Sequence, residues 1–167
     1  MKIALVTDST ADLPQQLIKQ WKILVLPLKV SFGHQQYLDC ELTSEEFYTR
    51  LEAESELPKT SQPSPEDFAS VYASALAEYD EVISVHISSG LSGTLNSAYV
   101  AAEKFAGKVH LVDSRSISLG IGQQVLEAAK GIQEGLTVQA VLDRISMMRD
   151  KMETIFTLDT LEYLHKG

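Results

Sequence analysis

The chain has few basic residues for its length. Over 167 residues, 14 Lys and Arg stand against 23 Asp and Glu, which gives a formal net charge of −9. Proteins that bind nucleic acid present basic patches to the phosphates, and anionic membrane surfaces attract basic segments. The composition therefore argues against a nucleic-acid partner and against adhesion to a membrane surface.

Long apolar runs are also missing. No stretch approaches the ~20 apolar residues that a membrane-spanning helix needs. The apolar run after Met1 and Lys2 covers residues 3–6, which is too short for a signal peptide. We therefore expect a cytoplasmic protein without stable membrane insertion.

Cysteine, metal-ligand spacing and phosphate-binding glycine loops are scarce or absent. Cys40 is the only cysteine, so no disulfide can form within the chain. The histidines, His34, His86, His110 and His165, lack the spacing of metal ligands. Neither the dinucleotide-binding glycine pattern nor the P-loop pattern occurs. We expect no metal, no cofactor and no ATPase activity.

What the sequence does contain is an alternation of strand-like and helical segments. Five apolar runs predict strands, at residues 3–6, 23–30, 81–87, 109–112 and 154–158. Pro27 indicates an edge or a bulge in the second run. Amphipathic helical patterns lie between the strands, with helix starts indicated by Ser64 before Pro65 and by Thr43 with Glu46. This order predicts an α/β fold with a mainly parallel sheet and helices on both faces, in one domain over residues 1–167.

Polar clusters follow three of the predicted strands, at residues 7–12, 88–94 and 113–116. The carboxyl ends of parallel strands meet at one edge of a sheet, and ligands collect there. We therefore expect the three clusters to lie along the same edge and to form a ligand site.

The turn at residues 88–94, with the sequence SSGLSGT, suits a small anion. It precedes a helix, and the first N–H groups of a helix have no partners within it and carry the positive end of its dipole. The turn has no Lys or Arg, which favours a carboxylate over a polyphosphate. The alternative is that these residues only cap the helix and shape the loop.

A second hydroxyl-rich loop covers residues 59–65, KTSQPSP. Its two prolines stiffen the chain and help to hold Thr60 and Ser61 in fixed positions. A simple helix start capped by Ser64 would account for that serine, but it leaves Thr60 and Ser61 unexplained.

A serine hydrolase acting on acyl esters is an alternative from another functional class. Residues 90–94 approach the nucleophile pattern Gly-x-Ser-x-Gly between a strand and a helix, with Ser92 as the nucleophile. Thr94 replaces the last glycine, and only His110 and His165 follow in the chain. His86 lies within a strand pattern, where a packed histidine is the more frequent outcome.

Taken together, these loops resemble those of the DegV family of fatty-acid-binding proteins. The matching segments occur in the family's order and extend over nearly the whole chain. They are TDSTADLP at 7–14, TSQPSP at 60–65, SSGLSGT at 88–94, VDS at 112–114 and TLDTLEYLHKG at 157–167.

The resemblance implies a carrier rather than an enzyme. Family members bind one long-chain fatty acid, such as palmitate or oleate, with the acyl chain in a tunnel. They present its carboxylate to a separate ATP-dependent fatty acid kinase. Matched motif by motif, Thr60 and Ser92 would grip the carboxylate. The neighbouring residues of the same motifs, which the resemblance places around it, are Ser61, Ser89, Gly93 and Thr94.

The family also has a second domain after the segment that ends at Gly167. We therefore expect residues 1–167 to correspond to the first domain of the family, without the second. Part of the tunnel wall would then be absent, binding would be weaker, and a homodimer would be one way to cover the apolar surface. A domain that has lost ligand binding and only associates with a partner remains a third alternative.

Overall fold

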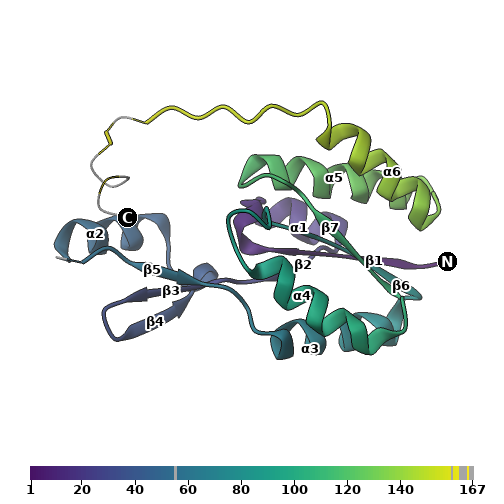
Figure 1. The fold of residues 1–167 in the computed structure, drawn as a ribbon, viewed down its shortest axis with the longest axis horizontal. Helices are drawn as coiled ribbons and strands as arrows, with labels where there is room; N and C mark the ends of the chain where they lie inside the picture. The colour runs from purple at the N-terminus through teal and green to yellow at the C-terminus, as the bar shows by residue number, and fades with distance from the viewer. Residues whose placement is uncertain (55, 159, 162–164, 166–167) are drawn as a thin grey trace.

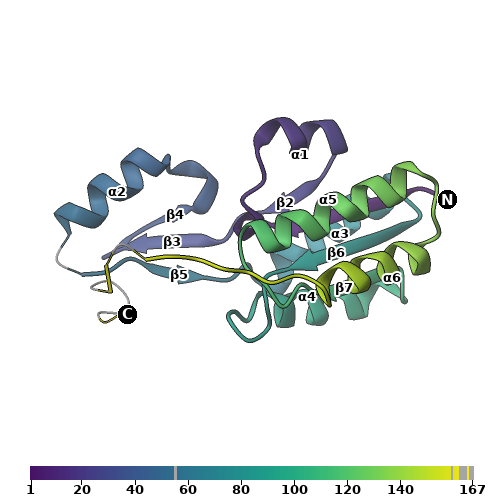
Figure 2. The same cartoon turned by 90° about the horizontal axis from the view of Figure 1, so that it is seen from above.

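The computed structural model describes residues 1–54, 56–158, 160, 161 and 165. Its main unit is a four-stranded parallel sheet with helices on both faces (Figure 1; Figure 2). This confirms the predicted α/β class. The strand order is β2-β1-β6-β7, and the strands are β1 Ile3–Asp8, β2 Leu24–Leu26, β6 Glu81–His86 and β7 Val109–Asp113.

Strand β1 is buried along its whole length, and its first four residues, 3–6, are apolar because they face packed helices on both sides of the sheet. Leu5 points into a cluster with helices α1, α5 and α6, whereas Val6 points into a cluster with α3 and α4. The helices are α1 Gln15–Trp21, α2 Ser44–Ala53, α3 Pro65–Glu78, α4 Thr94–Ala102, α5 Leu119–Gln133 and α6 Val138–Arg149, with short 3-10 turns at Ser9–Ala11, Asp39–Glu41 and Glu103–Phe105.

The predicted helix starts are confirmed by their capping bonds. Thr43 Oγ1 accepts from the N–H of Glu46, and the Glu46 carboxylate accepts from the N–H of Thr43. Ser64 and Asp67 form the same reciprocal pair at the start of α3, with Pro65 at its first position.

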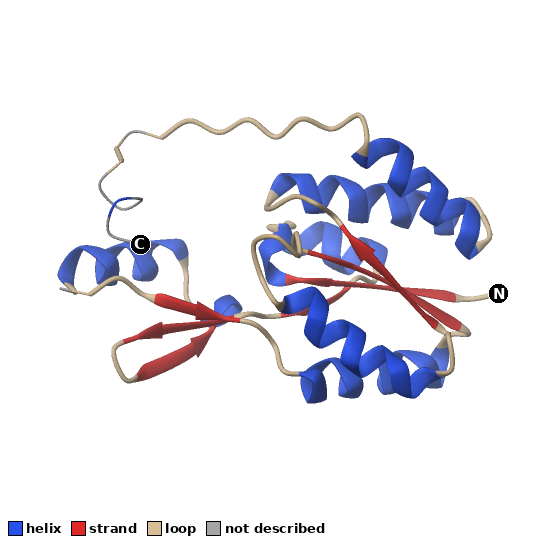
Figure 3. Ribbon diagram, viewed as in Figure 1, coloured by secondary structure: helices blue, strands red, loops and turns tan. Residues whose placement is uncertain are grey.

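The predicted strand at 23–30 is divided between two sheets, which the sequence analysis did not foresee. Residues before Pro27 form β2, an edge strand of the parallel sheet, as expected for a strand next to proline. Residues after it form β3 Lys29–Phe32, the central strand of an antiparallel sheet with β4 Gln35–Leu38 and β5 Lys59–Ser61 (Figure 3). Strands β4 and β5 were not predicted, because both are short and largely polar and exposed.

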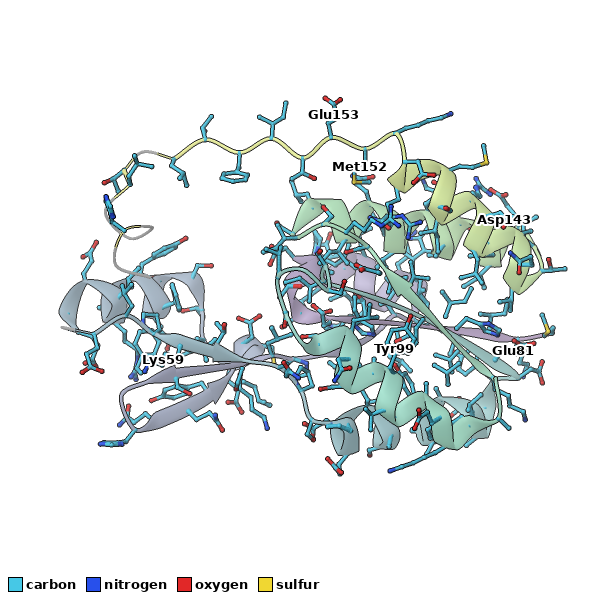
Figure 4. The ribbon with its side chains drawn as sticks, in the orientation of Figure 1. Lys59, Glu81, Tyr99, Asp143, Met152 and Glu153 are labelled. Atoms are coloured by element: carbon cyan, nitrogen blue, oxygen red, sulfur yellow. The ribbon has the colours of Figure 1, made fainter. Side chains whose placement is uncertain are left out.

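The predicted strand at residues 154–158 is wrong. The segment after α6 is extended but pairs with no strand in the described part of the chain, and Figure 1 shows it running from α6 toward the end of the molecule that carries α2. The side chains of Met152 and Glu153 leave it on opposite sides, as in any extended backbone (Figure 4). Ile155 and Phe156 are 85% and 74% exposed, so their strand-like composition does not reflect burial in a sheet.

Candidate functional site

The three polar loops meet at the carboxyl edge of the parallel sheet, as predicted. The N–H of Ser88 donates to the carbonyl of Ser116 at 3.0 Å, which joins the loops after β6 and β7. The Ser89 hydroxyl donates to Asp113 Oδ2 at 2.6 Å across the same junction. The N–H of Ile87 donates to Asp8 Oδ2 at 3.1 Å, which adds the loop after β1. The sheet topology thus brings distant segments of the sequence to one edge.

The carboxylate of Asp113 is held in its ionised form by this junction. Burial raises its pKa, but hydrogen bonds from the hydroxyl and N–H of Ser89 and from the N–H of Arg115 outweigh that effect, so the pKa lies below its usual value. The Ser89 hydroxyl is therefore already engaged in bracing the turn.

Ser92 lies in the middle of the serine turn, half-buried, just before α4. Its Oγ lies 2.9 Å from the hydroxyl of Thr94 and accepts the N–H of Thr94 at 3.2 Å. The N-cap residue of α4 is Gly93, and no side chain caps this helix. Ser92 therefore shapes the local turn without serving as the helix cap, and the positive end of α4 faces the same turn.

Thr60 and Ser61 lie on β5, both exposed, rather than in a loop. Strand β5 pairs with β3 through Val30 opposite Thr60. Lys59, the preceding residue, is also exposed on this strand (Figure 4). This pairing fixes the backbone of Thr60.

Gln62 brings the two hydroxyl-rich segments together. Its Nε2 donates to Ser97 Oγ on α4 at 2.9 Å. Its amide also lies over Gly93, and an added Cβ on that glycine would stand 2.8 Å from Gln62 Cδ, closer than real Cβ atoms approach. Sequence reasoning missed Gln62, because a glutamine beside two prolines looks like an ordinary solvent-facing residue.

A second cluster of polar side chains is buried between the sheet and α3, and we call it the buried polar chain: Asp8, His86, Ser84 and Tyr72. All four are 0% exposed. His86 Nδ1 lies 2.9 Å from Asp8 Oδ2, His86 Nε2 lies 2.6 Å from Ser84 Oγ, and Ser84 Oγ lies 2.9 Å from the Tyr72 hydroxyl. Every member is satisfied when Tyr72 donates to Ser84, Ser84 to Nε2, and Nδ1 to Asp8.

The electrostatics of the buried polar chain favour an ionised Asp8. Burial raises the pKa of this carboxyl, but the hydrogen bond and electrostatic attraction from His86, with hydrogen bonds from Thr10 and Ile87, bring it below its usual value. Burial also raises the pKa of the Tyr72 hydroxyl, which stays protonated. The prediction that His86 is a packed histidine is confirmed. The cluster itself was missed, although Ser84 and His86 stand two residues apart on one strand and so share a face.

Comparison with known proteins assigns the chain to a family. A family model described as "Uncharacterised protein, DegV family" matches residues 2–167. The chain belongs to the DegV family. A DegV domain-containing protein of Deinococcus radiodurans is 41% identical over 98% of this chain and 59% of its own length.

Two solved DegV structures share the fold. One, described as showing fatty acid binding of a DegV family protein from Thermus thermophilus, is 45% identical with a TM-score of 0.93, over 100% of this chain and 60% of that one. The other, described as DegV, a fatty acid binding protein from Bacillus subtilis, is 35% identical with a TM-score of 0.84, over 90% of this chain and 54% of that one. The chain thus spans about 60% of the length of its DegV relatives.

Apolar side chains surround the polar turn of this DegV domain. Leu91 in the turn is 64% exposed, Ile117 in the loop after β7 is 43% exposed, and Leu119 at the start of α5 is 72% exposed. A cavity of about 410 Å³ lies at the carboxyl end of β1, with Leu13 and Leu42 among its lining residues. That volume is within the ~300–1,000 Å³ typical of small-molecule sites. The edge of the sheet therefore combines hydroxyl groups with exposed apolar surface.

The hydrolase alternative receives no support from this geometry. In the described part of the chain, the Ser92 hydroxyl is hydrogen-bonded to Thr94 and to no histidine. The Ser84–His86–Asp8 series has the connectivity of a catalytic triad, but a serine that is 0% exposed cannot meet an ester.

Among residues 1–54, 56–158, 160, 161 and 165, no three His, Cys, Asp or Glu side chains lie together in a way that could hold a metal ion. Within the same residues, none of the helices has the length and hydrophobicity of a membrane-spanning segment. The motif at residues 157–167 lies partly outside the described residues.

Proposed function

We propose that this DegV domain binds a long-chain fatty acid, such as palmitate or oleate, and that the hydroxyls of Thr60 and Ser92 hold its carboxylate. The observation that carries the proposal is the contact of Gln62 with Ser97 and Gly93, because it joins the strand of Thr60 to the turn of Ser92. The related proteins of Thermus thermophilus and Bacillus subtilis, described as fatty-acid-binding, support the same ligand class.

The chemistry of the site suits a carboxylate. Thr60 is exposed and Ser92 half-buried, so both hydroxyls can donate to a ligand at the rim, and the N-terminus of α4 adds its positive end. A neutral set of donors is adequate for one negative charge, because hydrogen bonds to ionised groups are stronger than those between neutral groups. The neighbouring Ser61, Gly93 and Thr94 belong to the same two segments and complete the proposed site. Ser89 acts there through its bond to Asp113.

The acyl chain would lie against the exposed apolar side chains beside the turn. Leu91, Ile117 and Leu119 offer surface that is otherwise left in water. Each CH₂ group that the ligand buries contributes about 0.8 kcal/mol, so the tail supplies affinity and the hydroxyls fix the orientation.

The domain acts as a carrier in this proposal. It holds the carboxylate at an accessible edge and presents it to a separate ATP-dependent fatty acid kinase in the cytoplasm, with no cofactor of its own. The exposure of Thr60 supports this role, because a partner can reach a carboxylate held there.

Mass spectrometry of lipid extracted from the purified protein tests the proposal, followed by calorimetric titration of delipidated protein with palmitate. We expect a co-purified C16–C18 fatty acid and saturable binding of palmitate, with methyl palmitate as the control that lacks the carboxylate. Equal binding of acid and ester would contradict the assigned carboxylate site. Addition of a fatty acid kinase and ATP to the loaded protein should give an acyl phosphate that hydroxylamine traps, and ATP alone should give none.

A further inference from the structure

We infer that Gln62 is a positioning residue that locks Thr60 and Ser92 at a fixed separation, so that the two hydroxyls bind a carboxylate as one unit. This inference rests on the proposed function. It assigns Gln62 an indirect role, in which the residue holds the two binding hydroxyls in place and does not itself bind the ligand. Gln62 is exposed as a residue, but its amide donates to Ser97 on α4 and lies over Gly93.

The anchor point on α4 is rigid. Ser97 is 4% exposed, and its N–H donates to the carbonyl of Gly93 at 3.1 Å, which forms the first turn of the helix. Ser97 and Gly93 therefore move together with the start of α4. Gln62 donates to Ser97 and lies over Gly93, so it holds β5 in a fixed position relative to the turn that carries Ser92.

The backbone around Gln62 is fixed on both sides. Ser61 pairs with Lys29 in the antiparallel sheet, and Ser64 caps α3 through the N–H of Asp67. Pro63 between them is buried. The side chain of Gln62 therefore starts from a defined position, and its amide spans the gap between the antiparallel sheet and α4.

Gly93 is the matching surface for this amide. Its φ of −75° is ordinary for any residue, so the backbone does not require glycine there. The requirement comes from Gln62, whose amide occupies the space that a Cβ would take. Alanine at position 93 would displace the flexible end of Gln62 while leaving the backbone of the turn intact.

The first test compares palmitate affinity in the wild type, Gln62→Ala and Gly93→Ala by calorimetry. We expect each single variant to bind about 3- to 10-fold more weakly, which corresponds to the cost of ordering a freed segment. In the Gln62→Ala background, Gly93→Ala should cause no further loss of palmitate affinity, because the Gln62 amide that it would displace is already absent. Additive losses, or unchanged affinity in Gln62→Ala, would overturn the inference.

The second test separates positioning from general stability. Coupling between Thr60→Val and Ser92→Ala is measured in the presence of Gln62 and again in Gln62→Ala. We expect strong coupling in the first case and near additivity in the second, whereas a purely structural Gln62 would leave the coupling unchanged. Asn96→Ala, an exposed change on the same helix, and Gln139→Ala on α6 serve as controls for the helix and for loss of a glutamine.

A third measurement needs no ligand. Amide ¹⁵N relaxation of the free protein should show increased mobility of residues 60–62 in Gln62→Ala and in Gly93→Ala, and unchanged mobility in the controls. If the wild type does not bind palmitate, the proposed function fails, and unchanged relaxation would separately overturn the role of Gln62.

Discussion

Two groups of polar residues in this fold differ in burial. The buried polar chain, Asp8, His86, Ser84 and Tyr72, is 0% exposed and internally satisfied. Thr60 and Ser92, which we call the rim hydroxyls, lie on β5 and in the serine turn, where Thr60 is exposed and Ser92 is half-buried. The first group has the connectivity of a hydrolytic triad and the second has none, yet only the second can meet a ligand.

The two groups are linked, because the buried polar chain supports the base of the rim. Asp8 accepts the N–H of Ile87, the residue directly before the serine turn, and His86 accepts the N–H of Ser114 through its carbonyl. Burial makes the first group a source of rigidity and expensive to disrupt. Because the rim hydroxyls are exposed, changing them should cost little stability but should weaken ligand binding. Substitutions in the two groups should therefore separate stability from affinity.

The largest effect is expected for Asp8→Ala in the buried polar chain. The change leaves His86 Nδ1 and the N–H of Ile87 without their buried acceptor. Each buried donor left without an acceptor costs about 1–3 kcal/mol, so we expect the free energy of unfolding to fall by about 2–6 kcal/mol, which urea unfolding would measure. Asp143→Ala, an exposed position on α6 (Figure 4), is the matched control and should change the free energy of unfolding by about 0.5 kcal/mol or less.

A stability loss for Asp8→Ala no larger than that of Asp143→Ala would remove the basis for the comparison. In that case the buried polar chain would be a packing coincidence rather than the support of the rim.

The rim hydroxyls should show the opposite behaviour. Thr60→Val and Ser92→Ala each lose a hydrogen bond to a charged group, worth ~1.5–3 kcal/mol, or about 10- to 150-fold in palmitate affinity. We expect the free energy of unfolding to change far less than in Asp8→Ala. Calorimetry and urea unfolding on the same samples measure both quantities.

An ester assay adds a control on the alternative function. We expect no turnover of a p-nitrophenyl acyl ester by the wild type, since Ser92 lacks a histidine partner. Turnover that disappears in Ser92→Ala would reverse the assignment in favour of a hydrolase.

Tyr72→Phe probes the far end of the buried polar chain with a smaller change. It removes the hydroxyl that lies 2.9 Å from Ser84 Oγ and keeps the ring that packs beside Phe68 and Phe105. We expect a loss of about 0.5–1.5 kcal/mol in the free energy of unfolding and an unchanged affinity for palmitate. A drop in affinity that matches the drop in stability would show that the two groups are not separable.

The difference between the groups also explains what the sequence could reveal. Strands rich in apolar and β-branched residues, such as β1 and β6, and helices with capping pairs, such as Ser64 with Asp67, were predictable because the signal is local. The motif resemblance pointed to the rim hydroxyls. The location of Gln62 over Gly93 depends on the antiparallel sheet, which was not predicted. No local pattern in the sequence therefore indicated this contact.

The errors have the same physical origin. Residues 154–158 have strand-like composition, but a strand needs a partner with free backbone groups, and that depends on tertiary structure. The division at Pro27 follows from its missing N–H, which is a local property of the sequence. The placement of β3 in a second sheet depends on the whole topology. Asp8 and His86 are 78 residues apart and meet only because β1 and β6 are neighbours.

The smallest effect concerns acid pH and would sharpen the description of Asp8. Its pKa in the folded protein lies below the ordinary value of 3.8, because bonds and charge from His86, with bonds from Thr10 and Ile87, outweigh burial. The stabilisation is therefore complete well above pH 3.8, where both states are ionised, and is lost as the pH falls through the folded pKa. At pH 4 the unfolded carboxyl begins to bind protons, so this group accounts for a loss of at most about 0.3 kcal/mol relative to neutral pH. Carboxyl ¹³C titration by NMR measures the folded pKa directly. A titration midpoint of Asp8 above 3.8 would mean that burial outweighs the hydrogen bonds. The carboxyl would then take up a proton more readily than in the unfolded chain, and the buried polar chain would carry no fixed charge in mild acid.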